Sequence, residues 1–219
     1  MPAGVETGAE PQENRELMNI FVTGASGFVG KAFLKALTPL LTGDDRVFAL
    51  SRRPAAGPGG NTVHFTGDLR DPGTFRPALL EADYVFHIAG EPDLAAGKEK
   101  ARLKYTSTRD LLAILKGRGR LKKFIHVSSI AAAGRRPGAP IAGPLEPDGD
   151  YPPGSDYGRS KRDAEKEVAA SGIPFTIFRP GFVYGAGMRP RSHINKFLSL
   201  VVSNSPLAFL NIPGKLSLI

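Results

Sequence analysis

The sequence predicts an α/β fold in which a doubly wound parallel sheet is covered by helices on both faces. Short, nearly continuous apolar runs alternate with helix-like segments, a pattern that is typical of parallel strands buried on both sides. The first apolar run also leads directly into a turn of spaced glycines and then into a helix pattern. A chain of 219 residues with 41% hydrophobic residues can bury such a core.

Six strands are expected from runs of β-branched and aromatic residues bounded by turn residues. They cover residues 19–23, 46–51, 62–66, 83–89, 123–128 and 174–179. Helix patterns lie between them at 30–41, 74–81, 97–117 and 157–171, and loops rich in glycine and proline at 54–60 and 134–155. The ligand cleft of a doubly wound sheet lies beyond the carboxyl ends of its strands, so the informative residues should follow each strand.

The turn after the first strand has the spacing of a phosphate-binding loop. Gly24, Gly27 and Gly30 follow Thr23 and precede a helix pattern. The first glycine would permit a tight exit from the strand, the second would let the backbone approach a pyrophosphate, and the third would let helix and strand pack closely. The helix N-terminus would then face the phosphate charge. The alternative is an ordinary glycine-rich turn.

A tyrosine and a lysine, Tyr157 and Lys161, lie four residues apart in the last helix pattern and therefore on one helix face. A nearby ammonium stabilises a phenolate and lowers its pKa, which would make the tyrosine a proton-transfer group. Ser128 and Ser129 end the fifth strand and bring a hydroxyl to the same sheet edge. The alternatives are an exposed helix pair and a strand-end cap.

Together these features resemble the short-chain dehydrogenase/reductase superfamily, and best its extended branch of NAD(P)-dependent epimerase/dehydratase-like proteins. The motifs that carry the resemblance are, in chain order, Thr-Gly-Ala-Ser-Gly-Phe-Val-Gly at 23–30, Gly67-Asp68-Leu69, His87-Ile88-Ala89-Gly90, Ser128-Ser129, Tyr157 with Lys161, and the segment from Arg179 to Gly185. The resemblance implies a Rossmann fold and an NAD(P)-dependent reaction that transfers hydride at a hydroxyl or carbonyl.

The resemblance also implies roles for the matching positions. Tyr157 would be the general acid/base, and Lys161 would lower its pKa and hold the nicotinamide ribose. Ser129 would orient the substrate oxygen, with Ser128 as the alternative if the register differs by one. The positions expected to bind the cofactor are Thr23, Gly24, Ser26, Gly27, Phe28, Val29, Gly30, Ser51, Arg52, Asp68, Leu69, Ala89, Gly90, Tyr157, Lys161, Pro180 and Val183.

The choice between NAD and NADP depends on the end of the second strand. Ser51-Arg52-Arg53 stands there, without an acidic residue. An acidic residue would bond the ribose 2′-hydroxyl, whereas an arginine suits a 2′-phosphate. The sequence therefore favours NADP(H), with Arg52 as the main contact and Ser51 assisting. The alternative is that an arginine stacks on adenine or faces water and that NAD binds.

Composition limits the other classes of site. The net charge of +8 favours anionic partners such as a nucleotide phosphate, and the basic run at 116–123 is interpreted as a solvated helix end. Because there is no cysteine and the four histidines lack ligand spacing, no metal site is expected. His64, His87 and His126 are interpreted as packed strand residues. The lack of cysteine, of a signal peptide and of a long apolar run leads us to expect a cytoplasmic protein without a membrane-spanning segment.

Three regions are expected along the chain. Residues 1–18 would form a disordered tail, 19–187 the nucleotide-binding domain, and 188–219 the start of a substrate lobe that is cut short. Apolar residues in an incomplete lobe would be uncovered, which favours either self-association into a homo-oligomer or the binding of a partner. Arg189 and Arg191 would either meet an anionic substrate or be ordinary loop charges.

The leading hypothesis is an NAD(P)-dependent oxidoreductase, epimerase or dehydratase that acts on a small molecule. The alternative is a non-catalytic NADP(H)-binding scaffold or redox sensor of the same fold. It is favoured by the short C-terminal region and by Lys104, which stands where the family often has an asparagine. Nucleic-acid binding is not expected, because no recognition motif accompanies the positive charge.

Overall fold

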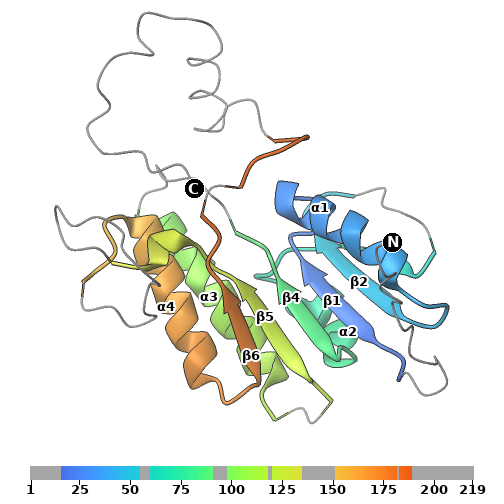
Figure 1. Ribbon diagram of the computed structural model, residues 1–219. Helices are drawn as coiled ribbons and strands as arrows, with labels where there is room; N and C mark the ends of the chain where they lie inside the picture. Colours follow the sequence, from blue (N-terminus) through green and yellow to red (C-terminus); the bar gives the residue numbers. More distant parts are fainter. Residues whose placement is uncertain are drawn as a thin grey trace, which may run out of the picture.

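The computed structural model describes residues 16–54, 60–90, 98–117, 120–134, 151–181 and 183–188, and of residues 98–105 it describes the backbone alone. Its centre is a six-stranded sheet in which all paired strands run parallel (Figure 1). The strands are β1 (Asn19–Thr23), β2 (Arg46–Ser51), β3 (Thr62–Thr66), β4 (Tyr84–His87), β5 (Lys123–Val127) and β6 (Phe175–Phe178). Their order, β3-β2-β1-β4-β5-β6, is that of a Rossmann sheet and confirms the predicted fold class.

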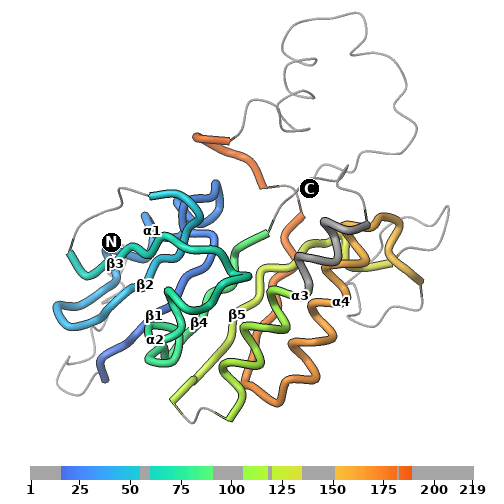
Figure 2. The backbone as a smooth tube through the Cα atoms, turned by 180° about the vertical axis from the view of Figure 1, so that it is seen from behind, coloured from blue at the N-terminus to red at the C-terminus, as the bar shows by residue number. Residues whose placement is uncertain are grey.

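Helices cover both faces of this sheet (Figures 1 and 2). The helices are α1 (Phe28–Leu37), α2 (Arg76–Leu80), α3 (Lys98–Leu115) and α4 (Asp156–Ala170), with short 3₁₀ turns η1 (Thr38–Leu40), η2 (Pro72–Thr74) and η3 (Ile130–Ala132). Side chains alternate along β1, so Ile20 and Val22 pack with Leu34 of α1, whereas Phe21 packs with the core of the opposite face. The apolar runs of β1 and β2 are therefore buried on both sides, as the sequence predicted, whereas those of β3 and β6, at the ends of the strand order, are partly exposed.

Two elements, α1 and β4, have boundaries that differ from the expected ones because of a proline and of a hydrogen bond to a side chain. The first helix was expected at 30–41, but α1 begins at Phe28 and gives way to η1 after Leu37. Pro39 has no amide hydrogen and cannot continue the α-helical ladder. β4 was expected to reach residue 89, but it ends at His87, and the amide of Ala89 donates instead to the Thr23 hydroxyl, 3.1 Å away.

The folded part includes residues that were expected in the tail. The backbone amide of Met18 donates to the buried Asp45 carboxylate at 2.9 Å, and that of Asn19 donates to the buried Asp83 carboxylate at 2.8 Å. These two side chains hold the start of β1 between β2 and β4. The remainder of the predicted tail, residues 1–15, and nearly all of the predicted substrate lobe, residues 189–219, lie outside the described residues. Among the described helices, none has the length and apolar character that a bilayer crossing requires.

Two stacked histidines form a buried polar layer beneath the carboxyl edge of β4 and β5. The rings of His87 and His126 lie 5.4 Å apart at an angle of 26°. His87 shares hydrogen bonds with the hydroxyls of Thr23 (2.8 Å) and Thr108 (2.9 Å). Both ring nitrogens of His126 lack a hydrogen-bond partner among the described residues. Both side chains are packed in the core, as the sequence predicted.

Burial makes these histidines sensitive to acid. Desolvation and the charge of Lys161 lower the pKa of His87 to about 3. Desolvation, with smaller contributions from His87 and Lys161, lowers the pKa of His126 to about 2. The unfolded chain binds protons at these side chains below a pH of about 6.5, whereas the folded chain does not. Titration of these two histidines therefore leaves the free energy of unfolding unchanged above that pH. It lowers the free energy of unfolding progressively as the pH falls toward the folded-state pKa values.

We expect His126→Phe to flatten the acid side of the stability profile. Each such histidine contributes a slope of up to about 1.4 kcal/mol per pH unit between pH of about 5.5 and 3.5. The variant should lose one such slope, and its stability at neutral pH should be kept or raised because no described hydrogen bond is broken. Urea unfolding at a series of pH values measures this. An unchanged slope would contradict the assignment. His87→Phe, which breaks the two threonine contacts, should be destabilised at neutral pH as well.

Candidate functional site

The glycine turn after β1 is packed so tightly that side chains are excluded at two of its positions. Gly24 has a φ of +71°, and a Cβ there would lie 2.8 Å from the backbone of Ala89. A Cβ at Gly30 would lie 2.2 Å from the carbonyl oxygen of Gly24. The first turn of α1 therefore rests directly on the loop that leaves β1, which agrees with the roles expected for these glycines.

The N-terminus of α1 is open for an anion. Its N-cap residue, Gly27, has no side chain to cap the helix, and the first turn contains no acidic residue. The amides of Phe28, Val29 and Gly30 have no acceptor within the helix by helix geometry. An uncapped helix N-terminus behind a glycine turn suits a phosphate, so these residues fit the pyrophosphate of a dinucleotide. Ser26 lies in the same turn.

The structure brings Ser129 and Tyr157 together. Ser129 is the N-cap of η3, where its hydroxyl accepts a hydrogen bond from the Ala131 amide at 3.2 Å. The Ser129 side chain also shares a hydrogen bond with Tyr157. Ser128 is buried, and its hydroxyl has no hydrogen-bond partner among the described residues. The second serine of the pair is thus the one that meets the tyrosine, and its action on a substrate oxygen stays a prediction.

Three residues that the sequence analysis did not single out hold this pair in place. A Cβ at Gly158 would lie 2.2 Å from the carbonyl oxygen of Ala131, so only glycine lets the start of α4 contact η3. Ser155 caps α4 by accepting from the Gly158 amide at 3.0 Å. Arg162 donates through Nε to the carbonyl of Ala132 at 2.8 Å. A serine three residues before a helical amide is a recognisable capping signal, but the other two contacts depend on tertiary packing.

The pKa of Tyr157 departs from the expected direction. Burial raises it above the usual value for a phenol, and the hydrogen bond with Ser129 acts in the opposite direction with less effect. Lys161 was expected to lower this pKa, but its ammonium donates to the carbonyl of Val127 at 2.8 Å. In the chain by itself the phenol is therefore held in its protonated form at neutral pH.

Lys161 lies between the ends of two neighbouring strands. Its side chain is 9% exposed, and a Cβ at Gly90 would lie 3.3 Å from its Nζ. The bond to Val127 fixes it at the end of β5, beside the chain that leaves β4. A buried ammonium at this edge can donate to hydroxyls of a ligand that lies between the two strand ends.

The residues expected at the adenosine end lie at the ends of β2 and β3. The buried Ser51 hydroxyl donates to the carbonyl of Arg53 at 2.6 Å, so it faces its own turn. Arg52 is exposed and acts electrostatically on Asp68. Asp68 accepts two hydrogen bonds from the Arg70 side chain, at 3.0 and 2.7 Å, and one from the Arg70 amide at 2.9 Å, and these contacts lower its pKa to about 2. Leu69 packs partly against the core.

The exit of β6 closes the edge of the site. The Ile130 amide donates to the carbonyl of Pro180 at 3.0 Å, which ties this exit to η3. Val183 is exposed, and a Cβ at Gly185 would lie 3.9 Å from the Phe28 ring of α1. The segment 183–188 thus runs back toward the N-terminus of α1 (Figure 1). Arg189 and Arg191 lie outside the described residues, as does the side chain of Lys104.

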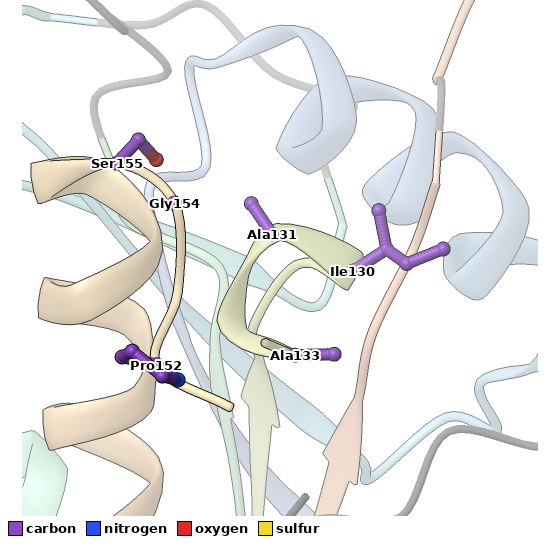
Figure 3. A pocket seen from close by; sticks show the side chains of 6 residues that line it. All are labelled: Ile130, Ala131, Ala133, Pro152, Gly154 and Ser155. Carbon is purple, nitrogen blue, oxygen red and sulfur yellow. The ribbon is translucent and has the colours of Figure 1, made fainter. Parts of the chain in front are cut away.

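A hollow of about 290 Å³ lies between η3 and the segment that leads into α4 (Figure 3). One wall is η3 and the residue after it, and the other is the segment that leads into α4. Its lining residues are Ile130, Ala131, Ala133, Pro152, Gly154 and Ser155. Ser129 directly precedes one wall in the chain and Tyr157 follows the other by two residues, whereas no residue of the glycine turn lines the hollow.

Comparison with known proteins identifies the family. The profile described as the NAD dependent epimerase/dehydratase family matches residues 20–208. The chain is 29% identical over 200 residues to the UDP-glucose 4-epimerase of Vibrio cholerae, covering 87% of this chain and 59% of that protein. It is 32% identical over 181 residues to Sterol demethylase protein B of Methylococcus capsulatus, covering 77% of this chain and 52% of that protein. The chain thus spans little more than half the length of these relatives.

A solved structure shows the same fold. The UDP-glucuronic acid 4-epimerase of Bacillus cereus, in complex with UDP-glucuronic acid and NAD, superposes with a TM-score of 0.71 at 24% identity, covering 87% of this chain and 65% of that one. The profile match extends over most of the chain and includes the glycine turn, Ser129, Tyr157 and Lys161. The chain therefore belongs to the NAD-dependent epimerase/dehydratase family.

Proposed function

We propose that this chain binds a nicotinamide dinucleotide, NADP(H) in preference to NAD(H), and transfers hydride at a hydroxyl or carbonyl of a small molecule. The observation that carries the proposal is the Ser129–Tyr157 hydrogen bond beside a buried Lys161, at the sheet edge that also holds the open N-terminus of α1. Relatives named as UDP-glucose 4-epimerase and as a quinoline-oxide ketoreductase support this class of reaction.

Different residues of the chain would bind the cofactor, orient the substrate and transfer the proton. The amides that open α1 would hold the pyrophosphate, and Lys161 would hold the nicotinamide ribose. The nicotinamide supplies the hydride acceptor or donor when it is bound. Ser129 would orient the substrate oxygen against Tyr157. Because burial keeps the phenol protonated, Tyr157 is suited to give its proton to a carbonyl oxygen as that carbon is reduced.

The preference for NADP rests on charge at the end of β2. Arg52 is exposed there, and positions 51–53 contain no carboxylate. The nearby carboxylate of Asp68 is engaged by Arg70, so it competes less for a ribose hydroxyl or for Arg52. The similar solved structures have NAD bound, so a preference for NADP would distinguish this chain from those proteins.

Replacing Tyr157 by phenylalanine should remove catalysis and keep cofactor binding. We expect kcat to fall by about 10²–10⁴-fold, as on removal of a general acid, with NADPH affinity changed by no more than about threefold. Stopped-flow absorbance at the nicotinamide band and fluorescence titration measure the two quantities. Tyr184→Phe is the matched control, because its ring is 73% exposed. If the 157 variant turned over at the wild-type rate, Tyr157 would not be the proton donor.

The non-catalytic sensor gives a different result in the same assay. Such a protein would bind NADPH tightly and never oxidise it with any member of a carbonyl panel. The Tyr157 pKa, which burial raises, is the observation that favours this second candidate.

Arg52→Ala should weaken NADPH binding selectively. Loss of a charge-assisted contact to a 2′-phosphate costs about 1.5–3 kcal/mol, which corresponds to a rise in the NADPH dissociation constant of about 10- to 100-fold. The NADH constant should stay within about twofold, since NADH has no 2′-phosphate. Arg46→Ala, at the opposite end of the same strand, is the control. Equal losses for both cofactors in calorimetric titrations would refute the assignment of Arg52.

A further inference from the structure

We infer that Arg70 sets the preference of this chain for NADP(H) over NAD(H), because it cancels the charge of the Asp68 carboxylate near Arg52. The inference deepens the proposed function and rests on it for the binding of a dinucleotide and for the place of the 2′-phosphate at Arg52. Its own support is the position of Asp68, the three hydrogen bonds that Arg70 donates to it, and the charge balance that these bonds leave.

The ends of β2 and β3 bring Asp68 near the residue that would hold the 2′-phosphate. The two strands lie side by side, with Ser51 paired to Thr66 in the register (Figure 2). Beyond this pair, the Gly67 amide donates to the Ser51 carbonyl at 3.0 Å. Arg52 and Asp68 each follow this contact directly along the chain, and the charge of Arg52 contributes to the lowered pKa of Asp68. A phosphate bound by Arg52 would therefore be repelled by an uncompensated charge on Asp68.

The turn after β3 holds Arg70 against Asp68. The Asp71 amide donates to the Asp68 carbonyl at 2.9 Å and closes this turn. Within it, the Arg70 amide and Nε donate to Oδ1 of Asp68, at 2.9 and 3.0 Å, and Nη2 donates to Oδ2 at 2.7 Å. A guanidinium that contacts both oxygens of a carboxylate adds geometric specificity to the charge-assisted bonds. Both oxygens of Asp68 are therefore engaged by a residue two positions further along the chain.

The Arg70–Asp68 pair acts through its charge more than through stability. The Arg70 side chain is 67% exposed and that of Asp68 34%, and exposed ion pairs contribute little to folding. With Arg70 in place the pair has no net charge, so the positive charge of Arg52 can attract a 2′-phosphate. Without Arg70, the Asp68 carboxylate would repel that phosphate and could accept the ribose 2′-hydroxyl of NAD(H). Loss of Arg70 should therefore shift the preference toward NAD(H).

We assign Arg70 a positioning role and not a contact with the phosphate. Its Nε and Nη2 already donate to Asp68, so the guanidinium acts on the cofactor through that carboxylate. The two roles predict different results when both residues lose their charge. Removing both charges restores the balance if Arg70 acts through Asp68, whereas the loss remains if Arg70 binds the phosphate itself.

The test measures the dissociation constants of NADPH and NADH for the full chain by calorimetric titration. The readout is the ratio of the NADH constant to the NADPH constant, from which contacts common to both cofactors cancel. Arg70→Met should lower this ratio at least fivefold. The double variant Arg70→Met/Asp68→Asn should return it to within twofold of the wild-type value. Arg109→Met is the matched control, because Arg109 is also exposed and lies 3.5 Å from a neighbouring aspartate, Asp110 of α3; it should change the ratio less than twofold.

Salt provides a second readout that a purely structural role would not move. Raising the ionic strength from about 0.1 M to about 1 M shortens the Debye length from about 10 Å to about 3 Å. Repulsion between an exposed carboxylate and a phosphate is screened under these conditions. The difference in ratio between the wild-type chain and Arg70→Met should therefore shrink at the higher salt.

Thermal melting confirms that each variant is folded before its constants are compared. The inference is overturned if Arg70→Met keeps the wild-type ratio, if the double variant keeps the full loss, if the control loses as much, or if neither cofactor binds. Failure of the proposed function has a different signature. In that case the wild-type chain binds NADPH without oxidising it, or prefers NADH, while the ratio still falls in Arg70→Met and recovers in the double variant.

Discussion

The close passage of two loop backbones at the carboxyl edge of the sheet is the constraint on which the site depends. Neighbouring strands β1 and β4 send their chains to opposite faces, so the exits at Gly24 and Ala89 must cross within van der Waals distance. The Thr23 hydroxyl binds the Ala89 amide, and His87 holds that threonine from below. Because these groups fix the crossing, the open end of α1 and the Lys161 ammonium come to face one region.

Electrostatics at this edge follow from burial. The charge of Lys161 adds to desolvation in keeping both histidine rings neutral. Its ammonium is satisfied by a backbone carbonyl at the end of β5. Because both rings are neutral, they add no positive charge beneath Lys161, whose ammonium lies at the sheet edge where phosphates and a ribose would bind.

The fold and the main site were predictable because their signals are local in the sequence. Apolar runs separated by helix patterns specify a parallel sheet, and the spacing of Gly24, Gly27 and Gly30 specifies the turn. The order of Ser129, Tyr157 and Lys161 then places one hydroxyl, one phenol and one ammonium at the ends of neighbouring elements. These predictions needed no information on packing.

The features that escaped prediction depend on contacts between distant segments. The pKa of Tyr157 is set by burial, which a spacing of four residues does not reveal. The roles of Gly158 and Arg162 arise from the approach of α4 to η3. The end of α1 before Pro39 could have been predicted from the sequence, because proline has no amide hydrogen to donate within a helix.

The position of β1 in the middle of the sheet determines where a tag fused ahead of it would lie. β1 is the strand that both halves of the described sheet must join, with β2 on one side and β4 on the other. Its entry is fixed by Met18 and Asn19 on two buried carboxylates. An affinity tag or protease scar fused immediately ahead of Met18 would therefore press on the midline of the molecule and not on an outer rim.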